Sequence, residues 1–391
     1  MGRILSIRCW DWANNNRFPL SNIKLFYKRN NLRFLESAII GKENAIFSDI
    51  GRRDHKGTFL NIADKVKDEY CIIGHFDSYR VDNCFDLRAL SIALVLVFKN
   101  VHHVNVIKKI CIAAVVCMHI NTINELLKLN IRPLKRFVVF SAVHETQNLL
   151  AQYFNLKGAH IIGLTHGSQF VYEKNIPRDV INYENLHYDC LVWGEMTKDE
   201  YVKFGIDDKT LFVAGYPKKI DVKGVNSKPW KNSCIVFLCR PAFDESNMRL
   251  MKVLAHFTND YSFSLKLHPD CDYVKYEGVC KDNNMKLLPK SMSLSDCMDS
   301  SLYSFAIAVN TTTYYEIQLA GIPCLRYDDG DSYDLMKGLD NDRFSNTEEL
   351  SKSIDWIRHI IDNNEYDELR DSSLKYNIGL GIDRYREFLL K

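Results

Sequence analysis

The chain has 391 residues, of which 46% are hydrophobic and 26% are charged. This composition predicts a folded chain and argues against general disorder, and because a single core rarely grows beyond about 300 residues, we expect two domains. The 51 basic and 49 acidic residues leave a net charge of +2. No nucleic-acid partner is expected from so balanced a charge, since duplex binding depends on a surplus of basic residues.

The cysteines and the apolar runs indicate a cytoplasmic protein. Twelve cysteines are scattered through the chain without a Cys-x-x-Cys pair, which is typical of reduced, buried thiols. No secretory signal pattern opens the sequence. The two most apolar runs, residues 89–98 and 110–118, are shorter than the ~20 residues that cross a bilayer, so we expect no transmembrane span.

Regular alternation of strands and helices begins near residue 135. Before that point the sequence shows only short apolar runs. A strand at residues 137–141, a helix at 145–156 and a strand at 161–165 form a β-α-β pattern, which predicts a parallel sheet. Further along we expect a strand at 190–193, a capping box at Thr197-Lys-Asp-Glu200 that opens a helix, and a strand at 211–215.

A second alternating series follows a polar, lysine-rich linker at residues 216–230. The expected fold is α/β, with two Rossmann-like doubly wound domains, residues 1–217 and 218–391, that face a central cleft. The last helix is placed to pack back on the first domain. The second series contains strands at 234–239, 263–268, 285–288, 305–309 and 323–327, and helices at 245–257, 312–320, 347–361 and 365–390, with a short one near Leu294.

Polar residues follow three of these strands. In an open parallel sheet, ligands bind beyond the carboxyl ends of the strands, and cations with hydroxyls suit phosphate oxygens. Two of the motifs also have a purely structural interpretation. His268-Pro269 would terminate a strand, and Thr313-Tyr-Tyr-Glu316 would form a capping box at a helix start. Glu316 is one turn inside its helix and within reach of a ribose diol. The predicted donor nucleotide site comprises Arg240, Lys266, His268, Pro269, Asn310, Thr311, Thr312, Thr313 and Glu316.

These motifs resemble those of a known group of enzymes. Lys266-x-His268-Pro269, followed by the threonine cluster and Glu316, is similar to the C-terminal half of GT-B glycosyltransferases of bacterial surface polysaccharides, such as sialyltransferases, Kdo transferases and polyol-phosphate transferases. Thr165-His-Gly-Ser168, Val192-Trp-Gly194 and Gly215-Tyr-Pro217 resemble the N-terminal half. The resemblance covers residues 135–330 and implies that His268 and the threonines hold the nucleotide, often CMP. The acidic pair with glycine that those sialyltransferases carry has no clear match here, which leaves the donor open.

The resemblance also implies that the first domain supplies a general base, for which His166 and Glu145 are the candidates. An imidazole exchanges protons near neutral pH, which suits His166 for deprotonating an acceptor hydroxyl. Glu145 would need desolvation to act in this way. The structural alternatives are a histidine that supports its loop and a carboxylate that stabilises a helix N-terminus. Asp77 and Asp82 are weaker candidates.

Two further patterns concern a metal and a membrane. Asp270-Cys-Asp272 and Asp329-Gly-Asp331 match the D-x-D metal site of GT-A enzymes, but a metal-independent GT-B reaction without a cofactor is preferred. The basic residues are either a solvated face or a surface for anionic lipid or a lipid-pyrophosphate acceptor. They are Lys99, His102, His103, Lys108, Lys109, Lys128, Arg132, Lys135 and Arg136.

Together these features predict an inverting GT-B glycosyltransferase of bacterial surface glycan synthesis, covering lipopolysaccharide, O-antigen or capsule. The expected donor is a CMP-activated acidic sugar of the sialic acid or Kdo type, and the acceptor is a glycan or a lipid-linked oligosaccharide. The expected location is the cytoplasm, with peripheral contact at the inner face of the membrane. The alternatives are a polyol-phosphate or nucleoside-diphosphate-hexose transferase and an inactive GT-B-like binding protein.

Overall fold

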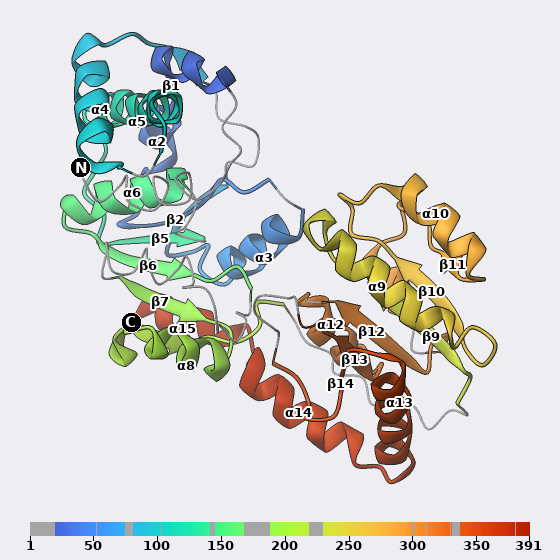
Figure 1. Ribbon diagram of the computed structural model, residues 1–391. Coiled ribbons are helices and arrows are strands. Elements are labelled where there is room, and N and C mark those ends of the chain that lie inside the picture. The colour runs from blue at the N-terminus through green and yellow to red at the C-terminus, as the bar shows by residue number, and fades with distance from the viewer. Residues whose placement is uncertain are drawn as a thin grey trace.

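Two six-stranded sheets form the centre of the molecule, one in each lobe (Figure 1). Every strand pair within both sheets is parallel. The α/β class and the two Rossmann-like sheets predicted from the sequence are therefore confirmed. The computed structural model describes residues 20–51, 53–74, 81–102, 104–140, 145–167, 188–218, 230–298, 301–309, 311–328, 330, 337–379 and 381–391.

The first sheet has the order β3-β2-β5-β6-β7-β8. Numbered along the chain, its strands lie 2-1-3-4-5-6, so the direction of winding reverses between β2 and β5. Side chains of β5 alternate between the two faces of the sheet, where Phe137 and Val139 enter one core and Val138 and Phe140 the other. The strands are β2 (Asn44–Ser48), β3 (Cys71–Gly74), β5 (Arg136–Phe140), β6 (His160–Leu164), β7 (Asp189–Val192) and β8 (Leu211–Val213).

The second sheet has the order β11-β10-β9-β12-β13-β14, which is 3-2-1-4-5-6 along the chain. Its winding reverses between β9 and β12. The edge strand β14 was not expected from the sequence, because two residues are too short to show a pattern. The strands are β9 (Ser233–Phe237), β10 (Ser262–Lys266), β11 (Lys286–Leu287), β12 (Phe305–Val309), β13 (Cys324–Tyr327) and β14 (Arg343–Phe344).

Helices cover both faces of each sheet and bury four apolar clusters. On the first sheet these are α2 (Phe34–Ala38), α3 (Arg53–Asp64), α6 (Glu145–Leu156) and α8 (Glu195–Lys203), with the 3-10 turn η2 (Asp208–Thr210) before β8. On the second they are α9 (Asp244–Ala255) after the turn η3 (Pro241–Phe243), α10 (Tyr273–Asp282), α11 (Leu294–Cys297), α12 (Thr313–Leu319), α13 (Thr347–Asp362) and α14 (Tyr366–Asn377). The capping box expected at Thr197–Glu200 is wrong, because α8 begins two residues earlier, with Gly194 as its N-cap.

A helical hairpin lies outside the first sheet. It consists of α4 (Leu87–Asn100) and α5 (Val106–Leu126), and it packs with η1 (Leu20–Tyr27) and a two-stranded antiparallel sheet of β1 (Lys28–Asn30) and β4 (Val81–Asn83). The run at 110–118 continues in both directions as α5, so the expectation that no segment could span a bilayer by length is wrong. α5 has 21 residues and a mean hydropathy of 1.7, although 67% of its most apolar window is buried inside the protein.

The C-terminal segment, predicted as one helix, is divided into α14 and α15 (Asp383–Leu390). The break lies at Gly379, whose φ of +61° is not helical, and the position requires glycine because a Cβ there would lie 2.4 Å from the carbonyl oxygen of Trp193. Beyond the break, α15 packs on the first sheet. Tyr70 Oη donates to the Leu389 carbonyl at 2.5 Å, and Tyr385 Oη donates to the Gly215 carbonyl at 2.9 Å.

Candidate functional site

The two winding reversals place polar residues at the carboxyl ends of β9, β12 and β2. Ligands of doubly wound sheets bind at such points, because the loops diverge there and leave the strand ends open. Arg240 follows β9, and Thr311 to Thr313 follow β12. Asp49 follows β2 in the first sheet. His268 follows β10, one strand away from the reversal in the second sheet.

A buried amide holds the loop after β9. The side chain of Asn247 is fully buried, accepts from the Cys239 N–H at 3.1 Å and donates to the Cys239 carbonyl at 2.9 Å. The same carbonyl accepts from the Cys271 thiol at 3.3 Å. Burial raises the pKa of Cys271 to about 11, so the thiol stays protonated and donates. These bonds tie the loop that carries Arg240 to the loop that carries His268.

Arg240 presents a cation at this edge. Its side chain is exposed, its guanidinium lies 5.7 Å from the centre of the Phe243 ring, and it forms no ion pair with any residue that the structure describes. A guanidinium with open donors suits phosphate oxygens. Lys266 points elsewhere, since its ammonium donates to the carbonyls of Pro289 and Lys290, each at 3.2 Å.

His268 has a defined tautomer when it is neutral. Its Nδ1 accepts from the Asp270 N–H at 3.2 Å, and Asp270 Oδ2 lies 3.6 Å from the same nitrogen. The ring proton is therefore on Nε2, which makes that nitrogen a donor. Pro269 follows at the point where β10 has ended, so the strand-terminating role and a ligand role are compatible here.

The hydroxyl cluster after β12 begins helix α12. Thr311 Oγ1 donates to Thr313 Oγ1 at 3.1 Å and accepts from the Thr313 N–H at 3.3 Å. The capping box expected between Thr313 and Glu316 does not form, because α12 starts at Thr313, and the N-cap residue Thr312 makes no side-chain cap bond. Asn310 lies outside the described residues.

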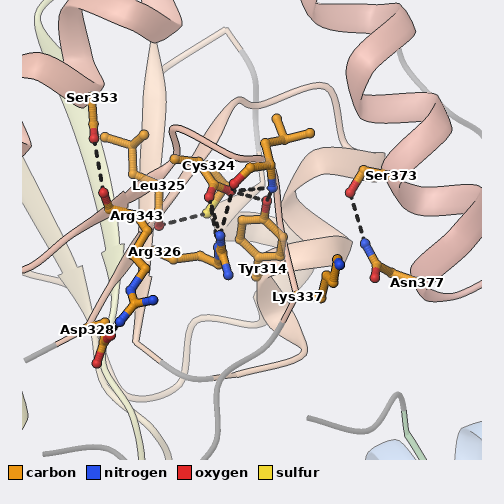
Figure 2. Close-up of polar contacts among 12 residues, drawn as sticks. Tyr314, Cys324, Leu325, Arg326, Asp328, Lys337, Arg343, Ser353, Ser373 and Asn377 are labelled. Carbon is orange, nitrogen blue, oxygen red and sulfur yellow. Dashed lines mark hydrogen bonds and ion pairs between the residues drawn. The ribbon is translucent and has the colours of Figure 1, made fainter. Parts of the chain in front are cut away.

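A buried ion pair between Arg326 and Asp342 holds α12 in place through Tyr314; Figure 2 shows Arg326 beside Tyr314. Asp342 is fully buried and accepts from Arg326 Nη2 at 2.6 Å and Nε at 2.9 Å, from the Leu339 N–H at 3.1 Å, and from the Tyr314 hydroxyl of α12. Burial raises the pKa of Asp342, and the Arg326 guanidinium, together with the other donors, opposes that shift. Gly338 permits the approach, since a Cβ there would lie 2.3 Å from Arg326 Nε.

Glu316 connects the two lobes. Its Oε1 accepts from the Tyr216 hydroxyl and from Lys218 Nζ, both at 2.6 Å. Burial and the neighbouring carboxylate raise the pKa of Tyr216, so its hydroxyl remains a donor. Glu316, the residue predicted to bind the ribose, is therefore held by the segment that follows the first sheet. Neither donor bonds to its second oxygen, Oε2.

A carboxylate that the sequence reasoning did not single out lies at the reversal in the first sheet. Asp49 Oδ1 accepts from Gln147 Nε2 at 2.9 Å, and the Gln147 side chain is fully buried in α6. The amide therefore fixes the orientation of the carboxylate. The signal in the sequence was an apolar run at residues 45–47 followed by Ser-Asp, which is too short to identify as a strand without its neighbours.

Two histidines meet beyond the carboxyl ends of the strands of the first sheet. His166 follows β6, and its ring centre lies 5.1 Å from that of His55, in the first turn of α3. His55 is 7% exposed and packs edge-on against Phe140, the last residue of β5. In the sequence, His55 belongs to a basic stretch without a recognisable pattern. Glu145 begins α6, but its side chain lies outside the described part of the chain.

The predicted base and the predicted donor site face each other. A Cβ built on Gly167, next to His166, would lie 3.9 Å from Thr312 Cγ2. The loop after β6 in the first sheet therefore lies close to the hydroxyl cluster after β12 in the second. The structure thus brings the segment of His166 and Gly167 near Thr312, whereas Lys266 is bonded to the loop after β11.

The remaining candidates lie elsewhere. Asp82 is on β4 and accepts from Asn31 at 3.0 Å, away from the strand ends, and Asp77 lies outside the described residues. Asp272 accepts from the Val274 N–H at 3.1 Å as the N-cap of α10, which is a structural role. Asp329 and Asp331 lie outside the description. Among the described residues, no group of three or more His, Cys, Asp or Glu side chains is placed to hold a metal.

Comparison with known proteins identifies the fold. No protein-family model matches the sequence, and no curated protein matches it. The structure is similar to the apo form of WaaB, a lipopolysaccharide outer core galactosyltransferase, with a TM-score of 0.55 and 12% identity over 90% of this chain and 99% of that one. The fold is GT-B.

Two other solved structures share the GT-B fold with this chain. A putative UDP-N-acetylglucosamine 2-epimerase from Listeria monocytogenes matches with a TM-score of 0.51 and 11% identity, over 90% of this chain and 95% of that one. The S. aureus MnaA–UDP complex matches with a TM-score of 0.50 and 12% identity, over 90% of this chain and 95% of that one. The GT-B resemblance inferred from the motifs is confirmed as a fold. The finer likeness to sialyltransferases and Kdo transferases is not supported.

Proposed function

We propose that the chain is a metal-independent glycosyltransferase that transfers the hexose of a nucleoside-diphosphate-hexose donor to a glycan acceptor. The observation that carries the proposal is the proximity of Gly167 to Thr312, where a Cβ built on the glycine would lie 3.9 Å from Thr312 Cγ2. It supports a site in which proton acceptors at the strand ends of one sheet work with phosphate-binding groups at the strand ends of the other. Glycosyl transfer needs both, since the acceptor hydroxyl must lose a proton as the phosphate departs with the bonding electrons.

On the donor side, Arg240 and the neutral His268 are proposed to bind the departing phosphate. Both offer N–H donors at strand ends, and Thr311 adds a hydroxyl. Fixed donors of this kind stabilise negative charge that develops in the transition state. Oε2 of Glu316 is proposed to accept from the ribose diol, because the two recorded bonds to this carboxylate end on Oε1.

On the acceptor side, His166 is the proposed base and Asp49 the second candidate. His55 packs beside His166, with the two ring centres 5.1 Å apart. A neutral ring can accept the hydroxyl proton. Asp49 is oriented for the same task by Gln147, or it aligns the acceptor.

The choice of donor rests on the fold. UDP is bound in the MnaA structure, and WaaB is a galactosyltransferase of the lipopolysaccharide outer core, which favours a UDP-hexose and a surface glycan of bacterial type. The CMP-linked acidic sugar inferred from the motifs is the second donor class. A UDP-sugar 2-epimerase is the second candidate function, because the Listeria structure shares the fold over nearly the same length.

The test is a donor panel with the purified full chain and EDTA present. UDP-, GDP- and CDP-hexoses and a CMP-sialic acid are incubated with and without a glycan acceptor, and products are resolved by NMR. Acceptor-dependent release of UDP supports the proposal. Release of CMP alone would instead favour a CMP-linked acidic sugar as the donor. Conversion of UDP-N-acetylglucosamine to its 2-epimer without an acceptor would show an epimerase. Binding without turnover would show a binding protein.

Matched variants test the residues. Arg240→Gln is expected to lower kcat/KM about a hundredfold. His166→Ala is expected to lower kcat by about 10² or more with little change in nucleotide affinity. Its control is His160→Ala, at the opposite end of the same strand, where the imidazole lies 2.9 Å from Asp189. Equal activity of the two alanine variants would exclude His166 as the base, and Asp49→Asn then tests the second candidate.

A further inference from the structure

The hairpin of α4 and α5 has an unusual distribution of side chains. The face of α4 that packs on α5 is made of Ala89, Ala93 and Val97, which are at most 2% exposed. Leu90, Ile92 and Leu94 are partly buried against the same cluster, whereas Leu87 and Val95 are 67% and 63% exposed. A helix that is apolar all round is ordinarily buried in protein or in lipid. Here one apolar stripe of α4 stays exposed.

The exposed face continues around the turn between the two helices. Val106 and Ile107, at the start of α5, are each 60% exposed, and Phe98 near the end of α4 is 41% exposed. Lys109 Nζ lies 5.5 Å from the centre of the Phe98 ring, which places a cation beside the apolar tip. We call Leu87, Val95, Phe98, Val106 and Ile107 the hairpin face.

The charge of this segment is one-sided. Residues 87–124 contain Arg88, Lys99, Lys108 and Lys109 and no Asp or Glu, although the chain as a whole is balanced at +2. Lys128 and Arg132, which were grouped with these cations in the sequence, lie past the other end of α5, about 30 Å away at 1.5 Å per residue. Lys135 pairs with Glu43 at 2.5 Å, and Arg136 donates to the Leu389 carbonyl. The basic neighbourhood is therefore two separate places.

The position of α4 in the fold suits a docking role. It lies at the outer edge of the first lobe, on the side away from the second sheet (Figure 1). Because α5 is buried behind it from Cys111 to Thr122, α5 supplies the support and α4 supplies the contact. A second copy of this chain is a poor partner for the hairpin face, since two such faces would bring eight cations together, and the carboxylate beside each face, Asp86, already accepts from backbone N–H groups as the N-cap of α4.

We propose that the hairpin face docks the protein on an anionic lipid bilayer. Leu87, Val95, Phe98, Val106 and Ile107 enter the boundary between headgroups and acyl chains, and the flanking lysines contact the lipid phosphates. The contact is peripheral, because α5 keeps its own buried packing. The inference is independent of the donor and of catalysis, and it leads beyond them to the surface on which the protein works.

Vesicle flotation with the full chain tests the proposal. The wild type is expected to bind vesicles that contain phosphatidylglycerol, to bind pure phosphatidylcholine vesicles less, and to be released by high salt. Val95→Gln with Phe98→Gln is expected to lower partitioning by roughly tenfold or more. The matched control is Leu156→Gln with Val274→Gln, on α6 and α10, where the side chains are 87% and 75% exposed. The control pair should bind like the wild type.

A charge variant separates the two contributions. Lys99→Gln is expected to lower binding to anionic vesicles by roughly fivefold and to leave binding to neutral vesicles unchanged. The proposal fails if the Val95 and Phe98 variant, shown to be folded by circular dichroism, binds vesicles like the wild type. It also fails if the control pair loses as much binding. Failure of alkaline carbonate to extract the protein would indicate instead that a helix spans the bilayer. A dimer in light scattering that dissociates in the Val95 and Phe98 variant would show that the hairpin face binds a second copy.

Discussion

Replacement of Asp342 by Asn tests the buried anchor of α12. The Asp342 carboxylate is fully buried, and the Arg326 side chain is 16% exposed. Removing one partner of such a pair leaves an uncompensated charge, which costs about 3–5 kcal/mol. Asn retains one oxygen that can accept from Arg326 or from Tyr314, and Arg326 Nη2 also donates to the Leu339 carbonyl at 3.0 Å. We therefore expect the lower end, about 3 kcal/mol.

The assay is urea unfolding followed by circular dichroism and by tryptophan fluorescence, and coincident transitions license a single free energy. Arg326→Met and the double variant complete a thermodynamic cycle. Because the double variant contains neither charge, its cost should fall short of the sum of the single costs by about 1.5 kcal/mol or more. Amide exchange in α12 should quicken in Asp342→Asn, since Tyr314 and Arg326 then compete for a single acceptor oxygen. Additive costs, or a single cost below about 1 kcal/mol, would refute the reasoning.

Two further predictions concern packing and pH. Gly338→Ala should cost about 2 kcal/mol, because the new methyl group would lie 2.3 Å from Arg326 Nε. Gly278→Ala, where nothing lies within 4 Å, is the control and should leave the thermal midpoint unchanged or raise it. Burial pushes the pKa of Glu125 up, but bonds from Arg33 and Arg29 hold it below its ordinary value of 4.5. Glu125→Gln should therefore lose stability at neutral pH, and its difference from the wild type should vanish as the pH falls below 4.5; a difference that persists in acid would contradict this.

The second lobe could be predicted almost strand by strand, because β9 and β12 are buried on both faces and stand out as continuous apolar runs. Strands β9, β10, β12 and β13 fall where the sequence indicates. The region before residue 135 resisted prediction, because β2 and β3 are short and their helices carry mixed patterns. The hairpin was missed for a physical reason, since α4 is apolar on its outer face and small on its inner one, the reverse of an ordinary surface helix.

The sequence predicted which residues of the candidate site lie at strand ends, but not how these residues are arranged relative to one another. Arg240, His268 and Thr311 follow strands in the sequence, and any parallel sheet would bring such residues to one edge. Which strands are neighbours depends on topology, which the sequence does not display. Asp49 and His55 could be seen only after β2 was paired with β5. The partners of Lys266 and Glu316 depend on side-chain directions that spacing does not fix.

The return of α15 to the first sheet affects how the protein can be made. Ile382, Tyr385 and Leu389 complete an apolar cluster whose other members include Ile46 on β2 and Phe59 and Ile62 on α3. During translation the first lobe cannot close this cluster until about residue 389 has left the ribosome, after the second lobe has been synthesised. A fragment ending at the linker would expose that apolar surface and aggregate, and only a circular permutant that moves α15 ahead of η1 would let the first lobe fold as a contiguous unit.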